Sequence, residues 1–249
     1  MKLTDFTTLT FDCYGTLIDW ETGIVAALRP WAERLRVDAG DDALLGAFGE
    51  HENRLERDRP TMPYPALLRA VAFDIGEHFG APMGDDEADA FAASVGDWPA
   101  FADSAEALAY LKQHYRLVVL SNVDNASFAR SNERLGVAFD AVCTAQDIGS
   151  YKPDPGNFRY LLDRLAGSGI EKRDILHTAQ SLFHDIAPAG KIGLATNWIN
   201  RRHGKPGAGA TMPTRATPDF THNSLAGFVA AHPARRWRAD QSAGIGSWD

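Results

Sequence analysis

Three things are scarce in this chain of 249 residues: cysteine, long apolar runs and an excess of positive charge. Its two cysteines, Cys13 and Cys143, lie in apolar, strand-like stretches, which predicts small buried side chains. No apolar run approaches the roughly 20 residues of a membrane-spanning helix, so we expect no membrane partner. The formal net charge of −8, without a strong cluster of Lys and Arg, argues against a nucleic-acid-binding protein.

The bulk composition fits an ordinary globular protein. Hydrophobic residues make up 45% of the chain and charged residues 23%, which suits one α/β domain with a smaller insertion at this length. The first predicted strand begins a few residues after Met1, so no signal peptide is expected in front of it. We therefore expect a cytoplasmic protein.

Strand-like and helix-like stretches alternate along most of the chain. Short aliphatic runs predict strands, and the longer amphipathic stretches between them predict helices. The strands are expected at residues 8–11, 117–120, 139–144, 175–179 and 193–198, and the helices between them at residues 104–114, 126–135 and 155–165. This alternation predicts an α/β fold with a doubly wound, Rossmann-like parallel sheet that is covered by helices on both faces.

One long block interrupts the alternation directly after the first predicted strand. Between residues 19 and 98 the apolar spacing is helical, and no clear strand pattern occurs. Helices are expected there at residues 21–35, 43–57, 64–79 and 85–95. We therefore predict an all-helical insertion at residues 19–98, a core formed by residues 1–18 and 99–233, and a C-terminal tail at residues 234–249.

Polar side chains of several kinds follow the predicted strands. Because the carboxyl ends of parallel strands meet at one edge of a sheet, we expect these side chains to converge in one crevice. The set consists of Asp12, Thr16, Ser121, Asn122, Lys152, Gln180, Ser181, His184 and Asp185.

Asp12 is the candidate nucleophile of this set. It ends a short apolar run and precedes a turn through Gly15. A nucleophilic carboxylate needs a nearby cation that keeps it ionised, and Lys152 can supply that charge. A second carboxylate, Asp185, can orient or deprotonate a water molecule. The residue types are therefore consistent with covalent catalysis by a carboxylate.

These residues resemble the motifs of the haloacid dehalogenase superfamily, in the same order and over most of the chain. The sequence Asp-Cys-Tyr-Gly-Thr at residues 12–16 matches the first motif, an aspartate followed by x-x-Gly-Thr. Ser121 matches the second motif, Lys152-Pro153 the third and Asp185 the fourth. The resemblance implies that the helical insertion is the cap of this superfamily.

Two positions differ from the metal-dependent phosphatases of that superfamily. Such phosphatases usually carry an acid two residues after the nucleophile, whereas this chain has Tyr14, a phenol whose ordinary pKa is about 10. They also hold Mg²⁺ with a Gly-Asp-x-x-x-x-Asp loop, and Gln180 replaces the first of those acids. We therefore expect no metal and no other cofactor.

Tyr14 and the pair Ser121-Asn122 are similar to type II (S)-2-haloacid dehalogenases. In that subfamily an aspartate displaces halide from the α-carbon of a 2-haloalkanoic acid, and water then cleaves the aspartyl ester to a 2-hydroxy acid. The resemblance implies a small 2-halo acid as substrate and a homodimer as assembly. It also implies that Asp12 attacks the α-carbon and that Thr16 and Lys152 stabilise the Asp12 carboxylate. Ser121 would then bind the substrate carboxylate, Asn122 would contact the halide, and Asp185 would orient or deprotonate the hydrolytic water.

The chain departs from the subfamily at three places. The subfamily loop Ser-Ser-Asn-x-x-Asp reads Gln-Ser-Leu-Phe-His-Asp at residues 180–185, so its water-handling asparagine is missing and Gln180, Ser181 or His184 would have to replace it. Phe158 stands where a tyrosine is expected. The candidates for the substrate-binding arginine of the cap are Arg54, Arg57 and Arg59.

Other interpretations stay open at this stage. A related hydrolase could use Asp12 to open a strained C–N ring of another small acid. A phosphatase could hold Mg²⁺ through Asp12 and Asp185 alone, and a catalytically weak family member could act as a binding protein. His184 is either a loop histidine or a water ligand, and Tyr14 either lines the pocket or belongs to the core.

Overall fold

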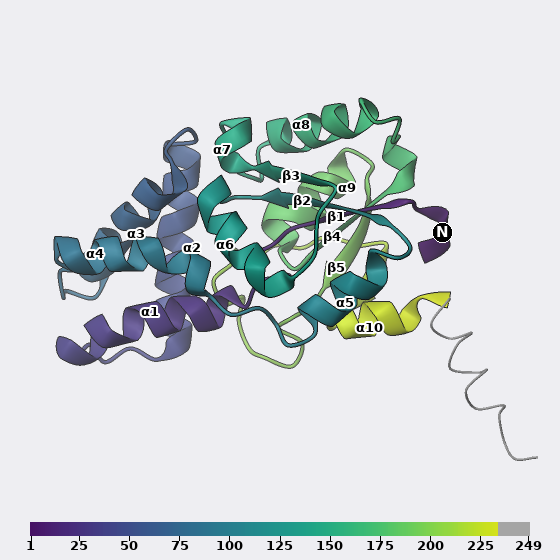
Figure 1. Ribbon diagram of the computed structural model, residues 1–249. Coiled ribbons are helices and arrows are strands. Elements are labelled where there is room, and N and C mark those ends of the chain that lie inside the picture. Colours follow the sequence, from purple (N-terminus) through teal and green to yellow (C-terminus); the bar gives the residue numbers. More distant parts are fainter. Residues whose placement is uncertain (234–249) are drawn as a thin grey trace, which may run out of the picture.

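The computed structural model describes residues 1–233, and the predicted tail at residues 234–249 lies outside the described residues. Within the described range, six strands form one parallel sheet in the order β3-β2-β1-β4-β5-β6 (Figure 1). Their bounds are β1 Thr8–Phe11, β2 Arg116–Ser121, β3 Ala141–Thr144, β4 Ile175–Ala179, β5 Ala195–Ile199 and β6 Phe220–His222. The predicted α/β fold with a doubly wound parallel sheet is confirmed.

The five predicted strands are present, with small shifts of their ends. β3 begins two residues later than expected, and β5 is shifted toward the C-terminus because Gly193 adopts a positive φ of 73° in the turn before it. β6 was not predicted. It has three residues, none of them fully buried, and so carries no alternating pattern that a sequence could reveal.

Helices cover both faces of the sheet. On one face lie α5 (Ser104–Leu111), α6 (Asn125–Leu135) and α10 (Leu225–Ala231), and on the other lie α8 (Pro155–Ala166) and α9 (Ala187–Lys191). Alternate residues of β2 serve the two sides: Leu117 and Val119 pack with the first group, and Val118 and Leu120 with the second. The shorter elements of this part are η1 Leu3–Asp5, α7 Ala145–Ile148, η3 Lys172–Asp174 and the π-helical turn η4 Leu182–Ile186.

The strand order reverses beside β1, which places the crevice for a ligand. The chain adds β2 and β3 on one side of β1 and then crosses to add β4, β5 and β6 on the other side. At the carboxyl end of β1, Phe11 lies in register with Val119 of β2 and with Thr178 of β4. In open parallel sheets the ligand site lies at this kind of reversal, outside the carboxyl ends of the strands.

Residues 20–97 form a block of helices next to that edge (Figure 1). It contains α1 (Trp20–Arg34), α2 (Asp41–Asp58), α3 (Tyr64–His78), α4 (Asp85–Ala93) and η2 (Ser94–Asp97). Asp19 caps α1 by accepting a hydrogen bond from the Thr22 N–H at 3.3 Å. The apolar faces of these helices join the hydrophobic cluster of the sheet, so the block is packed onto the core.

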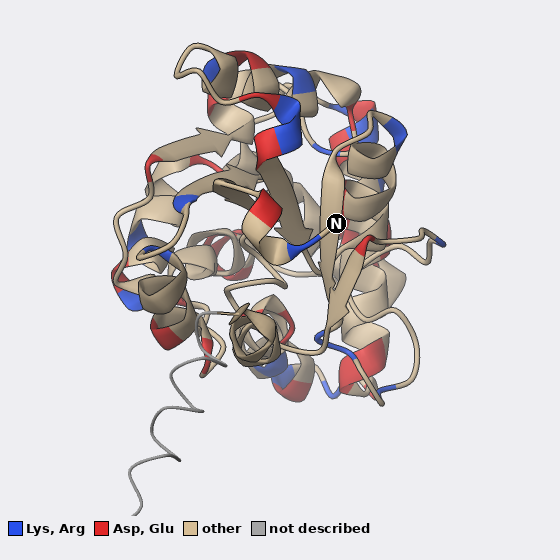
Figure 2. Cartoon of the chain, turned by 90° about the vertical axis from the view of Figure 1, so that its right-hand side faces the viewer, with Lys and Arg blue, Asp and Glu red and all other residues tan. Residues whose placement is uncertain are grey.

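The exterior agrees with the composition. Figure 2 shows Lys and Arg interspersed with Asp and Glu on the face that it presents, without a continuous basic area. In the described part of the chain, no helix combines the length and apolar character needed to cross a membrane. Cys13 and Cys143 are both free and buried, as predicted.

Candidate active site

Asp12 lies directly after β1, at the edge of the sheet that faces the helical block. Its Oδ2 accepts a hydrogen bond of 2.6 Å from the Thr16 hydroxyl. The Thr16 oxygen in turn accepts a hydrogen bond of 2.9 Å from the Gln180 N–H, so its own proton is directed at Asp12. The turn that brings Thr16 back to Asp12 passes through Gly15, whose φ of 91° favours glycine.

Lys152 joins the two predicted catalytic carboxylates. Its ammonium group donates hydrogen bonds to Asp12 Oδ1 at 2.9 Å, to Asp185 Oδ1 at 2.8 Å and to the Leu120 carbonyl at 3.0 Å. Burial would lower the pKa of Lys152, but Asp12 and Asp185 outweigh this effect and raise it, so the side chain stays charged. Burial raises the pKa of Asp12; Lys152 opposes this shift and Asp185 adds to it.

His177 is a second partner of Asp185, on the same oxygen as Lys152, and it was not predicted from the sequence. The His177 ring bonds Asp185 Oδ1 through Nε2 at 3.0 Å and the Thr10 hydroxyl through Nδ1 at 2.8 Å. Burial would raise the pKa of Asp185, but Lys152 and His177 outweigh it and hold the pKa below its usual value. The available signal was a histidine in the middle of the apolar strand β4.

Asn122 fixes the loop that carries Lys152. Its Oδ1 accepts from the Lys152 N–H at 2.7 Å, and its Nδ2 donates to the Lys152 carbonyl and to Glu56 Oε1, each at 3.0 Å. Both N–H groups of the amide are therefore in use, and neither is free to contact a halide. Ser121 also reaches the cavity, and its buried hydroxyl has no hydrogen-bond partner.

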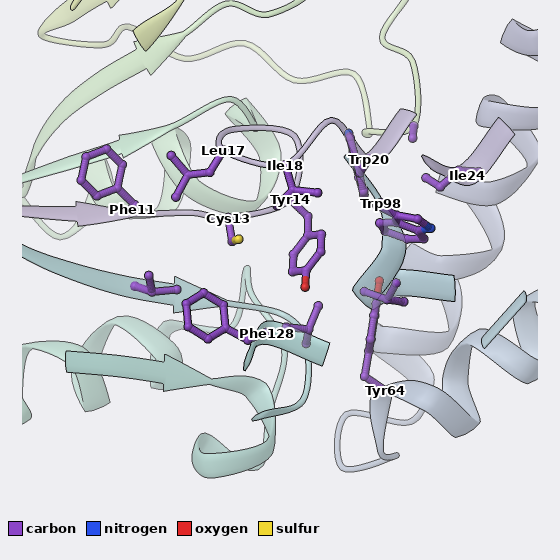
Figure 3. Close-up of a cluster of buried hydrophobic side chains, with 14 of the residues drawn as sticks. Phe11, Cys13, Tyr14, Leu17, Ile18, Trp20, Ile24, Tyr64, Trp98 and Phe128 are labelled. Atoms are coloured by element: carbon purple, nitrogen blue, oxygen red, sulfur yellow. The ribbon is translucent and has the colours of Figure 1, made fainter. Parts of the chain in front are cut away.

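Tyr14 lines the same cavity but does not bond the nucleophile. Its hydroxyl bonds the Ser131 hydroxyl at 2.8 Å. Figure 3 shows its ring in the apolar cluster at the base of the helical block, and Trp98 meets it edge to face with 5.8 Å between ring centroids. Burial raises the pKa of Tyr14 well above its ordinary value, so it is no acid at neutral pH.

Two glutamates of α2 complete the wall on the helical side, and the sequence analysis missed both. Glu52 and Glu56 are 3% and 4% exposed. Glu52 Oε1 accepts from the Tyr64 hydroxyl at 2.7 Å. Burial raises the pKa of Glu52 to about 7, and burial together with Glu52 raises that of Glu56 well above its usual range. The sequence feature that could have revealed them is a pair of acids four residues apart on the apolar face of a predicted helix.

Arg54 and Arg57, predicted to bind substrate, do not line this cavity. Arg54 forms an ion pair with Asp74 of α3 and is 42% exposed, and Arg57 pairs with its neighbour Asp58 and is 68% exposed. Arg59 is also exposed. These arginines lie on the solvent side of α2, because the inner face is occupied by Glu52 and Glu56. The structure therefore does not bring these candidates to the cavity, and a role in binding substrate stays a prediction.

The loop after β4 brings two of its three predicted polar side chains to the cavity. Ser181 and His184 line it, whereas Gln180 lines a neighbouring hollow together with Trp198. The Ser181 hydroxyl accepts from the His184 N–H at 3.0 Å and starts the turn η4. Burial lowers the pKa of His184 to about 4, so the ring is neutral at pH 7 and can accept a proton.

The cavity between sheet edge and helices has a volume of about 30 Å³, room for a water molecule or two. Several buried polar atoms around it lack a hydrogen-bond partner: Ser121 Oγ, Glu56 Oε2, His184 Nε2 and Asp185 Oδ2. Its lining consists of Asp12, Tyr14, Trp20, Glu52, Glu56, Tyr64, Ser121, Asn122, Val123, Lys152, Ser181, His184 and Asp185.

The donor set does not suit a Mg²⁺ ion. Asp12 and Asp185 each present Oδ1 to the Lys152 ammonium, and Gln180 stands where a further acid would be needed. Among the described residues, no group of three or more His, Cys, Asp or Glu side chains is arranged to hold a metal. What the arrangement offers is a carboxylate next to a fixed cation, with bases and acids around one small cavity.

The sequence matches known proteins over much of its length. A family model described as haloacid dehalogenase-like hydrolase matches residues 6–190. The (S)-2-haloacid dehalogenase of Pseudomonas putida is 24% identical over 210 residues, which cover 79% of this chain and 85% of that protein. (S)-2-haloacid dehalogenase 4A of Burkholderia cepacia is 32% identical over 110 residues, 43% of this chain and 46% of that protein. This chain therefore spans about half the length of the Burkholderia relative.

Solved structures share the fold. The L-2-haloacid dehalogenase of Xanthobacter autotrophicus with chloropropionic acid covalently bound superposes with a TM-score of 0.73 at 18% identity, covering 97% of this chain and 100% of that chain. The putative HAD-hydrolase YfnB of Bacillus subtilis bound to magnesium superposes with a TM-score of 0.72, also at 18% identity, covering 89% and 96%. At these identities the likeness is one of fold. The match of the family model over residues 6–190 shows that the chain belongs to the haloacid dehalogenase-like hydrolases.

Proposed function

We propose that this protein hydrolyses small 2-haloalkanoic acids to 2-hydroxy acids through an ester on Asp12. The observation that carries the proposal is the environment of Asp12. Lys152 and Thr16 each hydrogen-bond one of its carboxylate oxygens. Position 14 carries a tyrosine where phosphatases carry an acid, and the hydroxyl of Tyr14 bonds Ser131. Such a site suits attack on carbon and release of halide, which leaves without a proton. The similarity to (S)-2-haloacid dehalogenases supports the same reaction.

The first step is displacement at the α-carbon. An oxygen of Asp12 attacks the carbon, the carbon–halogen bond breaks and its electron pair leaves with the halide. Lys152 and Thr16 keep the attacking carboxylate ionised and fixed in direction. The free hydroxyl of Ser121 is available for the substrate carboxylate beside the sheet edge.

The second step is hydrolysis of the ester. Water attacks the carbonyl carbon of Asp12, a proton passes to a neighbouring base, and the 2-hydroxy acid departs with the Asp12 carboxylate restored. Asp185 Oδ2 and His184 Nε2 are buried, unpartnered acceptors around the cavity, which suits the orientation and deprotonation of that water. His184 thereby takes the place of the asparagine that the loop at residues 180–185 lacks.

The helical block acts in this proposal as a cap over the site. The cavity has room for a water molecule or two, so in this proposal the block or its side chains move to admit the substrate. Closure then excludes bulk water from the ester until the hydrolytic step. The cap would correspond to the predicted insertion at residues 19–98.

Halide release from monochloroacetate and 2-chloropropionate tests the reaction, with Asp12→Asn as the matched variant. We expect the wild type to release halide in the presence of EDTA, and Asp12→Asn to lose release by at least about 1000-fold because the amide is no nucleophile. Single turnover in H₂¹⁸O should place label in Asp12. Phosphate release from phosphate esters with Mg²⁺, in place of halide release, would reject the proposal.

A second candidate is opening of a strained C–N ring at the α-carbon of a small acid. The buried carboxyl groups of Glu52 and Glu56 favour it, because they can bind or protonate a leaving nitrogen on the helical side. Azetidine-2-carboxylate in the same assay panel separates the two candidates: ring opening without any halide release would favour the nitrogen substrate.

A further inference from the structure

Glu56 occupies the side of the cavity toward which a leaving group must depart. Displacement at carbon requires the leaving group to lie opposite the attacking atom. The attacking oxygen belongs to Asp12 at the sheet edge, and residues of α2 and α3 line the same small cavity from the helical block. Glu52, Glu56 and Tyr64 supply the polar atoms of that lining.

The geometry of Glu56 is that of a neutral carboxylic acid with a free proton. Its Oε1 accepts a hydrogen bond from Asn122, whereas its buried Oε2 has no hydrogen-bond partner. His184 Nε2 lies 3.6 Å from Glu56 Oε2, and this ring is neutral because burial lowers its pKa to about 4. Among the described residues no cation hydrogen-bonds Glu56, and the cost of burying its charge outweighs the attraction of Lys152, so we take Glu56 to be protonated, with Oε2 as the oxygen left to donate. The raised pKa of Glu56 agrees with this state.

Three other kinds of side chain near Glu56 do not offer a free proton to the cavity. Asn122 has both N–H groups engaged, Tyr64 donates its hydroxyl proton to Glu52, and the three candidate arginines of α2 and its end lie in solvent. Of the two buried acids that α2 contributes to the lining, Glu56 is the one with a buried carboxyl oxygen that lacks a hydrogen-bond partner.

We propose that the Glu56 carboxyl group hydrogen-bonds the departing halide, and that the site thereby accepts small 2-fluoro acids. Fluoride is the strongest hydrogen-bond acceptor of the halides and leaves from the strongest carbon–halogen bond, so a buried donor assists it most. Asp12 forms the carbon–oxygen bond, and the electron pair of the carbon–fluorine bond leaves with fluoride. Glu56 keeps its proton. The hydroxyl oxygen of the product comes from Asp12, and the hydrolytic water restores the Asp12 carboxylate oxygen and supplies both the hydroxyl proton of the product and the one proton released.

The inference rests on the proposed function. A comparison of two leaving groups distinguishes failure of the inference from failure of the proposed function. Fluoride release from fluoroacetate and bromide release from bromoacetate are measured for the wild type, Glu56→Ala, Glu56→Gln and the exposed control Glu50→Gln. For Glu56→Ala we expect fluoride release to fall about 100-fold, the usual effect of losing one such donor, and bromide release to fall less than about 10-fold. Glu56→Gln should regain part of the fluoride rate because its amide can donate, and Glu50→Gln should match the wild type.

Three results would overturn the inference, each in a different way. Equal losses for both halides in Glu56→Ala would mean that Glu56 only positions Asn122 and Lys152. A wild type that releases bromide but no fluoride would reject the inference and leave the proposed function intact. Release of neither halide would reject both. Thermal unfolding of each variant, together with the bromide rate, shows whether the site is still formed.

Discussion

Lys152 determines the geometry of the site at the scale of single residues. One buried ammonium group bonds two carboxylates and a backbone carbonyl, so it sets the distance between the nucleophile and the base. A buried ion pair adds little net stability compared with an apolar substitute, but removal of one partner leaves the other charges uncompensated. Here two carboxylates, Asp12 and Asp185, depend on the same cation.

We therefore expect Lys152→Met to be both inactive and unstable. Halide release should fall by at least about 100-fold, and the free energy of unfolding, measured in urea at pH 7, should fall by about 3–5 kcal/mol. The loss should shrink as the pH is lowered, because protonation removes the unpaired charges of Asp12 and Asp185. The exposed Lys191→Met on α9 is the control, with an expected change within about 0.5 kcal/mol. Unchanged stability of Lys152→Met would contradict this role for the cation.

Residues differ in how far their place in the site can be predicted from sequence. Asp12, Thr16, Lys152 and Asp185 could be placed because each follows a strand end, and strand ends of a parallel sheet share one edge. Glu52 and Glu56 could not, because a helix can turn either face toward the sheet and acids are usually found on the outer one. For the same reason the sequence offered Arg54, Arg57 and Arg59 as candidates for binding substrate, and none of the three lines the cavity.

At the scale of elements, α2 is held against the core by a segment that follows β5. Arg202 donates to Glu21 Oε2 of α1 at 2.6 Å, and the Ala210 N–H donates to Glu21 Oε1 at 3.2 Å. Ala210 is buried, and its carbonyl lies directly against Gly49 of α2. This contact fixes how closely α2, and with it Glu52 and Glu56, can approach the sheet edge.

Two glycines of α2 provide a matched test of that contact. In Gly49→Ala the new methyl group would overlap the Ala210 backbone, so we expect a loss of about 1–3 kcal/mol in the free energy of unfolding and slower halide release. In Gly46→Ala the methyl group meets no atom within 4 Å, and the same change should stabilise the helix by up to about 1 kcal/mol with normal activity. Similar values for the two variants would show that the approach of α2 does not depend on Ala210.

Helices and strands whose apolar residues repeat at a regular spacing were predicted well, and those without such a spacing were not. The helices of the block at residues 20–97 and the strands β1, β2 and β4 repeat apolar residues at a clear spacing. β6 and the short α7 are too brief to show a period, and the π-helical turn η4 depends on the hydrogen bond of Ser181 to its own loop. The conformation of such short segments depends on packing against residues far away in the sequence, and a local sequence pattern does not contain this information.

At the scale of the whole molecule, buried titratable groups make stability depend on pH in two opposed ways. His184 is buried neutral with its pKa lowered to about 4, so its contribution to stability rises as the pH increases from about 4 to its ordinary 6.5. Glu52 is buried with its pKa raised to about 7 from an ordinary 4.5, so its contribution is present at low pH and is lost as the pH rises through that range. The dependence of the wild-type free energy of unfolding on pH is the sum of such contributions. The contribution of a single group is therefore measured as the difference between the wild type and a variant that lacks it.

The difference between the wild type and Glu52→Gln isolates one of these terms. Because folded Glu52 binds its proton between pH 4.5 and 7 while the unfolded chain releases it, the wild type should lose up to about 3 kcal/mol of stability relative to the variant over that range. Urea unfolding at pH 5, 6, 7 and 8 measures the difference, and Glu50→Gln, in solvent on the same helix, should follow the wild type at every pH. If the difference between the wild type and Glu52→Gln stayed constant from pH 5 to 8, Glu52 would be ionised in the folded protein throughout, and a wall of neutral acids opposite Asp12 would no longer be tenable.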